Sequence, residues 1–197
     1  MIRVFIKRNK YILGLSLIVN LVLITIIHYQ YVHNSNNLEQ KINQKMVHSL
    51  FTSSFFTNKY FPDIIVKQIN NDSTLSTMFN EATIAILLSN AGCNPCQVRE
   101  LILLDSLYKN SSMMKNVVAI YDGINKMEAL YLKKVSQAKF PFFITKGAQF
   151  ADFNFTKKYP IIFLIEKQKI TFCYVPLAES DKFSKMAINV LQGRLTK

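Results

Sequence analysis

The chain has 197 residues, of which 50% are hydrophobic and 18% are charged, and its formal net charge at pH 7 is +12. This length suits one domain beyond an apolar N-terminal segment and argues against a second. Four of the 24 basic residues lie in the first ten positions, and the others are dispersed without the arginine-rich, aromatic-interleaved clustering of a nucleic-acid groove, so nucleic acid is not an expected partner.

A membrane anchor is predicted at the N-terminus. Residues 11–27 are almost wholly apolar, and as a helix they would span about 26 Å, close to the roughly 30 Å of a hydrocarbon core. Basic residues precede this segment and none follows before Lys41, so the positive-inside rule places the N-terminus in the cytoplasm. We expect residues 1–31 to form the basic end and a transmembrane helix, with the rest of the chain facing the periplasm or the cell exterior.

A cleaved signal peptide is the alternative to this anchor. The stretch that follows, residues 28–34, lacks small residues in the A-x-A arrangement at which such peptides are cut, which favours an uncleaved signal-anchor. No cysteine lies near the end of the apolar segment, so a lipid is not expected to replace the helix. The lipid bilayer is therefore an expected partner through residues 11–27.

Residues 32–60 are expected to join the anchor to the domain. Leu38, Ile42, Met46 and Leu50 recur at every fourth position, which predicts a short amphipathic helix. Such a helix either forms a stalk that holds the domain away from the membrane or packs on the domain.

Residues 61–197 are expected to form one α/β domain. Apolar, β-branched runs predict strands at residues 64–66, 83–88, 117–121, 140–144, 161–165 and 170–175, the last two forming an antiparallel hairpin. Helical spacing predicts a helical turn at residues 74–79 and helices at residues 98–108, 124–136 and 180–191. The alternation of strands and helices predicts a central sheet flanked by helices.

The inner faces of two of these helices are predicted from their large apolar residues. For the helix at residues 124–136 they are Met127, Leu130 and Val135. For the last helix they are Phe183, Met186, Val190 and Leu191.

Cys93 and Cys96 are the residues with the clearest chemistry. They lie between a predicted strand and a predicted helix, and their spacing lets them form a reversible disulfide. A thiol at a helix N-terminus faces unpaired backbone N–H groups and the positive end of the helix dipole, so its pKa falls below the free value of about 8.5. We expect Cys93 to be the attacking sulfur and Cys96, one turn further in, to resolve the mixed disulfide.

A C-x-P-C pattern, here Cys93, Pro95 and Cys96, lies at a predicted strand-to-helix junction. On this pattern first, the chain resembles the thioredoxin superfamily over roughly residues 61–192. Pro160 at the start of the hairpin and the closing helix after it support the resemblance. Within the superfamily the chain is similar to membrane-anchored, outward-facing redoxins. The resemblance thus implies a thioredoxin-like central mixed sheet flanked by helices.

The resemblance also implies roles for individual residues. Cys93 corresponds to the nucleophile and Cys96 to the resolving thiol, with Asn94 and Pro95 between them as supporting parts of the motif. Pro160 corresponds to a proline that is cis in the family and lies against the cysteine pair. The backbone of Tyr159 would then dock the main chain of a substrate as an added strand.

The chain departs from the family pattern at two positions. Gly92 stands where an aromatic residue usually precedes the first cysteine, which reduces the apolar platform beside the sulfur. Leu87 stands where many relatives keep a buried Asp or Asn, so the usual proton acceptor near the resolving cysteine is missing. Glu100, one turn past Cys96, is the candidate substitute for it.

Other uses of the cysteines would need histidine or further cysteine ligands that the domain lacks. All three histidines precede residue 61, so the domain holds only Cys93, Cys96 and Cys173, too few for the four ligands of structural zinc. A copper site and a Cys-His hydrolase lack their histidine for the same reason. We expect Cys173 to be a buried small hydrophobe, and neither a metal nor any other cofactor is expected.

A peroxidase of the superfamily would show P-x-x-x-[ST]-x-x-C. The positions seven and three before Cys93 are Ile86 and Asn90, which disfavours peroxide chemistry.

The sequence therefore predicts a membrane-anchored thiol-disulfide oxidoreductase. It would exchange the dithiol of Cys93 and Cys96 with disulfides of extracytoplasmic proteins, with reduction the favoured direction and a membrane protein as electron donor. The alternative, from another class, is an anchored binding module with a thioredoxin-like fold and a static or vestigial disulfide.

Overall fold

The computed structural model describes residues 19–35, 40, 53–71, 73–110, 116–145, 149–150, 152–153, 158–176 and 181–195. The chain divides into two compact units, Met1–Gln44 and Lys45–Lys197. Residues 19–35 of the first unit are helical. None of the described helices combines the length and the apolar character needed to cross a bilayer.

Two predictions lie largely or partly outside the described residues. The predicted anchor over residues 11–27 is described only from residue 19 onward. Of the predicted amphipathic helix at residues 38–50, only residue 40 is described. Both therefore stay predictions.

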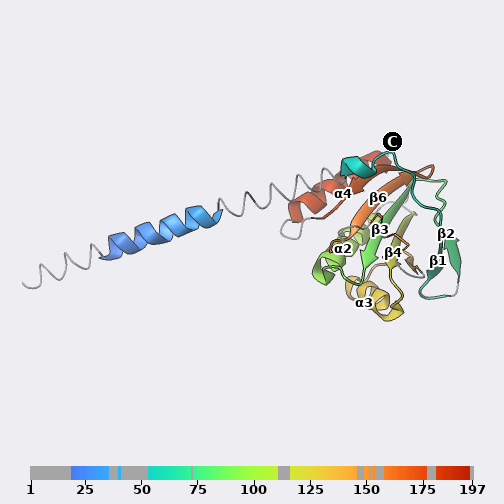
Figure 1. The fold of residues 1–197 in the computed structure, drawn as a ribbon, viewed down its shortest axis with the longest axis horizontal. Coiled ribbons are helices and arrows are strands. Elements are labelled where there is room, and N and C mark those ends of the chain that lie inside the picture. Colours follow the sequence, from blue (N-terminus) through green and yellow to red (C-terminus); the bar gives the residue numbers. More distant parts are fainter. Residues whose placement is uncertain are drawn as a thin grey trace, which may run out of the picture. The chain divides into compact units, whose positions relative to one another are not determined.

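The second unit is built on a seven-stranded sheet in the order β2-β1-β5-β4-β3-β6-β7 (Figure 1). The strands are β1 (Ile65–Gln68), β2 (Thr74–Ser76), β3 (Thr83–Ser89), β4 (Val117–Asp122), β5 (Phe142–Ile144), β6 (Ile161–Glu166) and β7 (Lys169–Tyr174). Every residue of β3 is buried, as expected for a strand covered on both faces. The strand pairs parallel with β4 and antiparallel with β6, so the sheet is mixed, as predicted.

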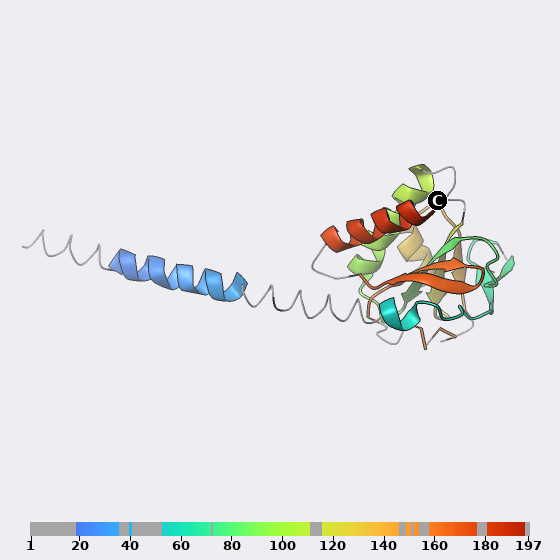
Figure 2. The same cartoon turned by 90° about the horizontal axis from the view of Figure 1, so that it is seen from above.

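Helices cover one face of this sheet (Figure 2). They are α2 (Asn94–Asn110), α3 (Lys126–Ser136) and α4 (Asp181–Leu195). A short helix at residues 53–56 lies on the opposite face. Each face has its own apolar core, the helical side containing Leu101 and Leu191 and the other side Phe56 and Phe163. A short loop therefore joins the end of β3, a fully buried strand, to the start of α2.

The predicted helical turn at residues 74–79 is wrong, because residues Thr74–Ser76 form the edge strand β2. β2 pairs antiparallel with β1, and Leu75 lies opposite Val66. Three residues are too few for a period to be read from sequence. The pairing with β1, a contact between separate segments, decides the conformation.

The predicted inner faces of two helices are partly wrong. In α3, Met127 and Val135 are exposed, and the buried residues are Ala129, Leu132 and Ser136. In α4, Met186 and Val190 are exposed, whereas Leu191 is buried as predicted together with Ser184, Ala187 and Ile188. Small residues on the inner face let a helix approach its neighbours closely, so the larger apolar residues are left outside.

The hairpin between β6 and β7 turns through two residues with positive φ, Lys167 at 49° and Gln168 at 65°. Such a two-residue turn matches the twist of the flanking strands. The Gln168 side chain donates to the carbonyl oxygens of Phe61 (2.7 Å) and Thr77 (3.1 Å) and accepts from the N–H of Phe79 (2.7 Å). The turn thereby holds the segment that precedes β3.

Gln168→Ala is expected to lower the free energy of unfolding by about 3 kcal/mol, because it removes three hydrogen bonds worth roughly 1 kcal/mol each. The measurement is urea unfolding of the full chain followed by circular dichroism. Lys167→Ala is the matched control, since it changes the same turn at an exposed side chain. Equal losses in the two variants would show that the turn conformation matters and the side-chain bonds do not.

Candidate redox site

Cys93 and Cys96 form a disulfide, with their Cα atoms 5.2 Å apart. Cys93 directly precedes α2 and is half-buried, whereas Cys96 lies in the first turn and is 4% exposed. Asn94 and Pro95 between them are exposed. The two sulfurs thus differ in access, and only Cys93 is open to an incoming partner.

The start of α2 bonds Cys93 through two backbone N–H groups, one to its sulfur and one to its carbonyl oxygen. The N–H of Cys96 donates to Cys93 Sγ over 3.4 Å, and the carbonyl oxygen of Cys93 accepts from the N–H of Gln97 over 2.9 Å. Cys93 therefore occupies the position that caps a helix N-terminus. No acidic residue lies in the first turn, so the positive end of the helix is uncompensated there. In general, a cysteine at such a position has its thiolate favoured by the helix N-terminus.

The segment before β6 lies against the cysteine pair. The N–H of Cys93 donates to the carbonyl oxygen of Lys158 over 2.7 Å. Tyr159 is half-buried and Pro160 is buried. The fold thus brings the predicted docking residues next to the predicted nucleophile, from positions more than sixty residues apart in sequence.

The expectation of a cis bond before Pro160 is not met, since the described residues contain no cis peptide bond. The trans form is the intrinsically favoured one for a bond before proline. Lys158 was missed by the sequence reasoning, because its contribution is a backbone carbonyl and no side-chain pattern marks it.

Glu100 is a fully buried carboxylic acid on α2, one turn beyond Cys96. Its Oε1 accepts from Ser184 Oγ over 2.7 Å and from Arg99 Nε over 2.9 Å. Its Oε2 has no hydrogen-bond partner among the described residues. Burial raises the pKa of Glu100 above its usual value, and the hydrogen bonds from Ser184 and Arg99 oppose this rise only in part.

No protein-family model and no curated protein matches this sequence. Solved structures do match. The thioredoxin domain of a thiol-disulfide oxidoreductase from Bacteroides vulgatus superposes with a TM-score of 0.53 at 12% identity, over 71% of this chain and 97% of that one. A protein described as a candidate thiol:disulfide interchange protein DsbE from Chlorobium tepidum gives 0.51 at 17% identity, over 68% and 96%.

The chain has a thioredoxin-like fold. A peroxidoxin, BcpB from Mycobacterium tuberculosis, also superposes, with a TM-score of 0.53 at 13% identity over 70% of this chain and 96% of that one. Thiol-disulfide oxidoreductases and peroxidoxins are therefore both similar to this chain in fold, and the fold alone does not distinguish their chemistries.

Both departures from the family pattern are visible in this thioredoxin-like fold. Leu87 is fully buried in the apolar core on the face of the sheet opposite the helices. Gly92 lies against the side chain of Gln97, and a Cβ at Gly92 would lie 2.6 Å from Gln97 Nε2. Gln97 was missed by the sequence reasoning, since a polar residue in the first turn of a helix is expected to be exposed.

Cys173 lies apart from the pair. It is buried in β7 within the core on the far face of the sheet, and burial raises the pKa of its thiol. The parts of the chain that the structure describes hold no group of three or more potential metal ligands. Cys173 therefore packs as the predicted small hydrophobe.

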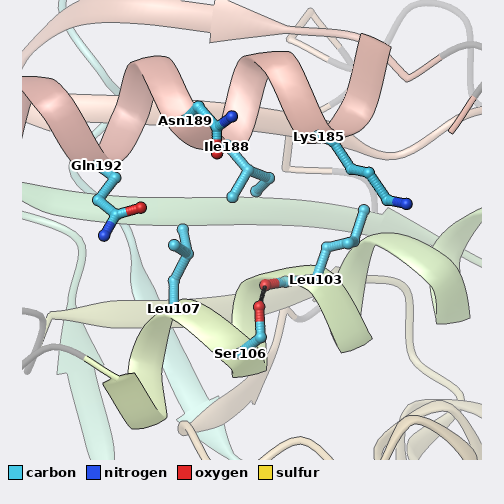
Figure 3. Close-up of a pocket in the computed structure, with 7 residues that line it drawn as sticks. All are labelled: Leu103, Ser106, Leu107, Lys185, Ile188, Asn189 and Gln192. Atoms are coloured by element: carbon cyan, nitrogen blue, oxygen red, sulfur yellow. Dashed lines mark hydrogen bonds between the residues drawn. The ribbon is translucent and has the colours of Figure 1, made fainter. Parts of the chain in front are cut away.

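A small pocket lies between α2 and α4 (Figure 3). Its volume is about 230 Å³, and it is lined by Leu103, Ser106, Leu107, Lys185, Ile188, Asn189 and Gln192. No cysteine lines the pocket, and the Ser106 hydroxyl donates a hydrogen bond to the carbonyl oxygen of Leu103. The pocket is thus separate from the redox pair.

Proposed function

We propose that this protein is a thiol-disulfide oxidoreductase that exchanges the dithiol of Cys93 and Cys96 with disulfides of other proteins. The observation that carries the proposal is the asymmetry of the pair. The half-buried Cys93 caps the N-terminus of α2, and its disulfide partner Cys96 is buried one turn further in. A nucleophile needs access and a stabilised thiolate, whereas a resolving thiol needs only to reach its neighbour.

The reaction proceeds in two exchanges. The Cys93 thiolate attacks one sulfur of a substrate disulfide, which forms a mixed disulfide and releases the other substrate sulfur as a thiolate. Cys96, after losing its proton, attacks Cys93 Sγ, which releases the second substrate thiol and forms the Cys93–Cys96 disulfide. Two electrons pass to the substrate, and a dithiol donor must then reduce the protein by the reverse sequence.

Glu100 is the group proposed to receive the proton of Cys96. Residues four apart on a helix are neighbours on one face, and both of these side chains are buried. The pKa of Glu100 is raised, so its carboxylate is a better proton acceptor for a thiol than a carboxylate of ordinary pKa. Its Oε2 makes no hydrogen bond to any described residue. Glu100 thereby supplies a buried carboxyl that Leu87 cannot.

Location, docking and direction belong to the same proposal. Residues 11–27 would anchor the chain, with the redox domain in the periplasm or at the cell exterior, where disulfides persist. The backbone at Tyr159 and Pro160 would pair with the substrate beside Cys93, which is supported by the bond from Cys93 to Lys158. Reduction of partner proteins, with electrons from a membrane donor, is the direction favoured.

The test is turnover by the full chain. The reduced protein is mixed with a peptide disulfide and a dithiol donor, and released thiols are counted over time. A rate above that of the donor alone, with many turnovers per chain, supports the proposal. A chain that binds the peptide without exchange would instead be a binding module with a static disulfide.

Glu100→Gln is expected to remove a pH dependence of stability. A carboxyl whose pKa is raised on folding contributes stability below its usual value of 4.5, and this contribution is lost as pH rises through the raised value. The Tm of Glu100→Gln relative to the natural chain should therefore increase as pH rises above about 4.5 and level off once the pH exceeds the raised pKa of Glu100. Glu166→Gln in the β6–β7 hairpin is the control, and parallel Tm curves for Glu100→Gln and the natural chain would contradict the burial argument.

A further inference from the structure

We propose that Gln97 is a positioning residue for the redox pair, and that Gly92 is present because any side chain there would displace it. Gln97 would fix the end of β3 to the first turn of α2, and thereby hold Cys93 Sγ at the helix N-terminus. The inference rests on the proposed function, since it assigns how the nucleophile of that site is held.

Gln97 is 1% exposed, and its side-chain amide uses every hydrogen it has. Oε1 accepts from the N–H of Ser89 over 3.0 Å. Nε2 donates to the carbonyl oxygen of Ser89 over 3.2 Å and to Asn94 Oδ1 over 3.3 Å. One side chain therefore pairs with the last residue of β3 as a neighbouring strand would, and also with the first residue of α2.

These bonds enclose the loop that carries Cys93. The loop from Asn90 to Gly92 leaves β3 at Ser89, and the N–H of Gly92 donates to the carbonyl oxygen of Ser89 over 3.1 Å. Beyond Cys93, the N–H of Gln97 returns to the Cys93 carbonyl oxygen over 2.9 Å. The Gln97 side chain thus bonds Ser89 before the nucleophile and Asn94 after it. Loss of the side-chain amide removes the hydrogen bonds that it makes at both of these residues.

Gly92 leaves the room that this amide needs. A Cβ at residue 92 would lie 2.6 Å from Gln97 Nε2 and 2.8 Å from Gln97 Cδ, closer than real Cβ contacts come. The backbone of Gly92 does not adopt the positive φ that favours glycine, so the cost of an alanine there comes from this contact alone, which forces the end of the Gln97 side chain to shift. The buried, hydrogen-bonded amide cannot move aside without losing its partners. We call the Gln97 side-chain amide, with its bonds to Ser89 and Asn94, the polar clamp. An aromatic residue at position 92 would occupy the space that this clamp fills.

The chemical consequence falls on the Cys93 thiolate. The cap from the Cys96 N–H to Cys93 Sγ spans 3.4 Å and depends on how the first turn is held. If the clamp is lost, the thiolate of the reduced protein loses this donor and the pKa of Cys93 rises. The reduced form then becomes less stable relative to the disulfide, so the pair becomes more reducing.

The experiment compares Gln97→Met, which keeps length and removes the hydrogen bonds, with Gln192→Met, the same change at an exposed position of α4. Two quantities are measured on the full chain: the pH profile of Cys93 alkylation in the reduced protein, and the equilibrium with glutathione. We expect Gln97→Met to raise the Cys93 pKa by about one unit and to shift the glutathione equilibrium about tenfold, or about 30 mV, toward the disulfide. Gln192→Met should change neither.

A double-mutant cycle tests the role of Gly92. Gly92→Ala should produce the same shifts as Gln97→Ala, and the double variant should be no worse than Gln97→Ala, because the clash needs both side chains. Additive shifts in the cycle would overturn the coupling. A lower Tm in Gln97→Met with an unchanged Cys93 pKa would overturn the positioning role and leave a structural one.

These readouts need neither a partner protein nor turnover. If the natural chain shows no turnover but the variants shift the Cys93 pKa as expected, the proposed function fails and the positioning role stands. If the chain turns over and the variants leave the Cys93 pKa and the glutathione equilibrium unchanged, the proposed function stands and the positioning role of Gln97 fails.

Discussion

Cys93→Ser is expected to lower the rate of disulfide exchange by at least about a thousandfold, because a serine hydroxyl at neutral pH supplies no comparable nucleophile. Cys96→Ser should behave differently. Its Cys93 thiolate still attacks, but no resolving thiol is present, so mixed disulfides with the substrate accumulate. The measurement combines thiol-release kinetics with non-reducing gels of the two variants.

Cys173→Ser is the control for that pair of variants, since Cys173 is buried on the far face of the sheet. Its exchange rate should match that of the natural chain. Mixed disulfides that form as readily in Cys93→Ser as in Cys96→Ser would reverse the assignment of nucleophile and resolving thiol.

Phe163→Ala is expected to lower the free energy of unfolding by about 3–5 kcal/mol, the usual range for a fully buried aromatic ring cut to a methyl group. Phe163 lies in β6 and is 0% exposed. Its ring centroid is 5.7 Å from that of Phe56, 5.6 Å from that of Phe61 and 6.2 Å from that of Phe153. The residue therefore joins β6 to the segments that cover the sheet face opposite the helices.

Phe55→Ala provides the matched control, because Phe55 is 49% exposed and adjoins the same cluster. Chemical unfolding of the two variants should give losses that differ by at least about 2 kcal/mol. Similar losses would mean that the packing around Phe163 relaxes to fill the space, and that this core is not closely packed.

The sheet was predictable from sequence because its central strands are covered on both faces. A strand buried on both faces needs a continuous apolar run, and residues 83–88 and 161–165 show such runs where β3 and β6 lie. The edge strand β2 lacks this constraint, so Thr74–Ser76 carries no comparable signal. Helix positions followed from spacing, but inner faces did not, since close approach selected Ala129 and Ser136 over Met127 and Val135.

The cysteine pair was also predictable, because its chemistry depends on local spacing and on the start of a helix. The rest of the site depends on contacts between distant segments. Lys158 reaches Cys93 through the return of the chain into β6, and Ser184 reaches Glu100 from α4. Gln97 is local in sequence, but its partner Ser89 belongs to the preceding strand. One amino-acid sequence, without the fold, does not identify such partners.

Leu87 and Glu100 lie on opposite faces of the sheet, in different surroundings. Leu87 fills the apolar core on one face of the sheet, and a charged group there would be buried without a partner. Glu100 lies on the helical side, where Ser184 and Arg99 supply hydrogen bonds. The buried carboxyl of Glu100 therefore lies on the helical side of the sheet, with hydrogen-bond partners that the core around Leu87 does not offer.

The most direct test of the central claim is the reactivity of the three thiols in the reduced full chain. Alkylation by iodoacetamide is followed residue by residue with mass spectrometry across pH 5 to 9. We expect Cys93 to react fastest, with a pKa below the free value of about 8.5, Cys96 to react more slowly, and the buried Cys173 to react last. A Cys93 that reacts no faster than glutathione at the same pH, or more slowly than Cys96, would contradict the account.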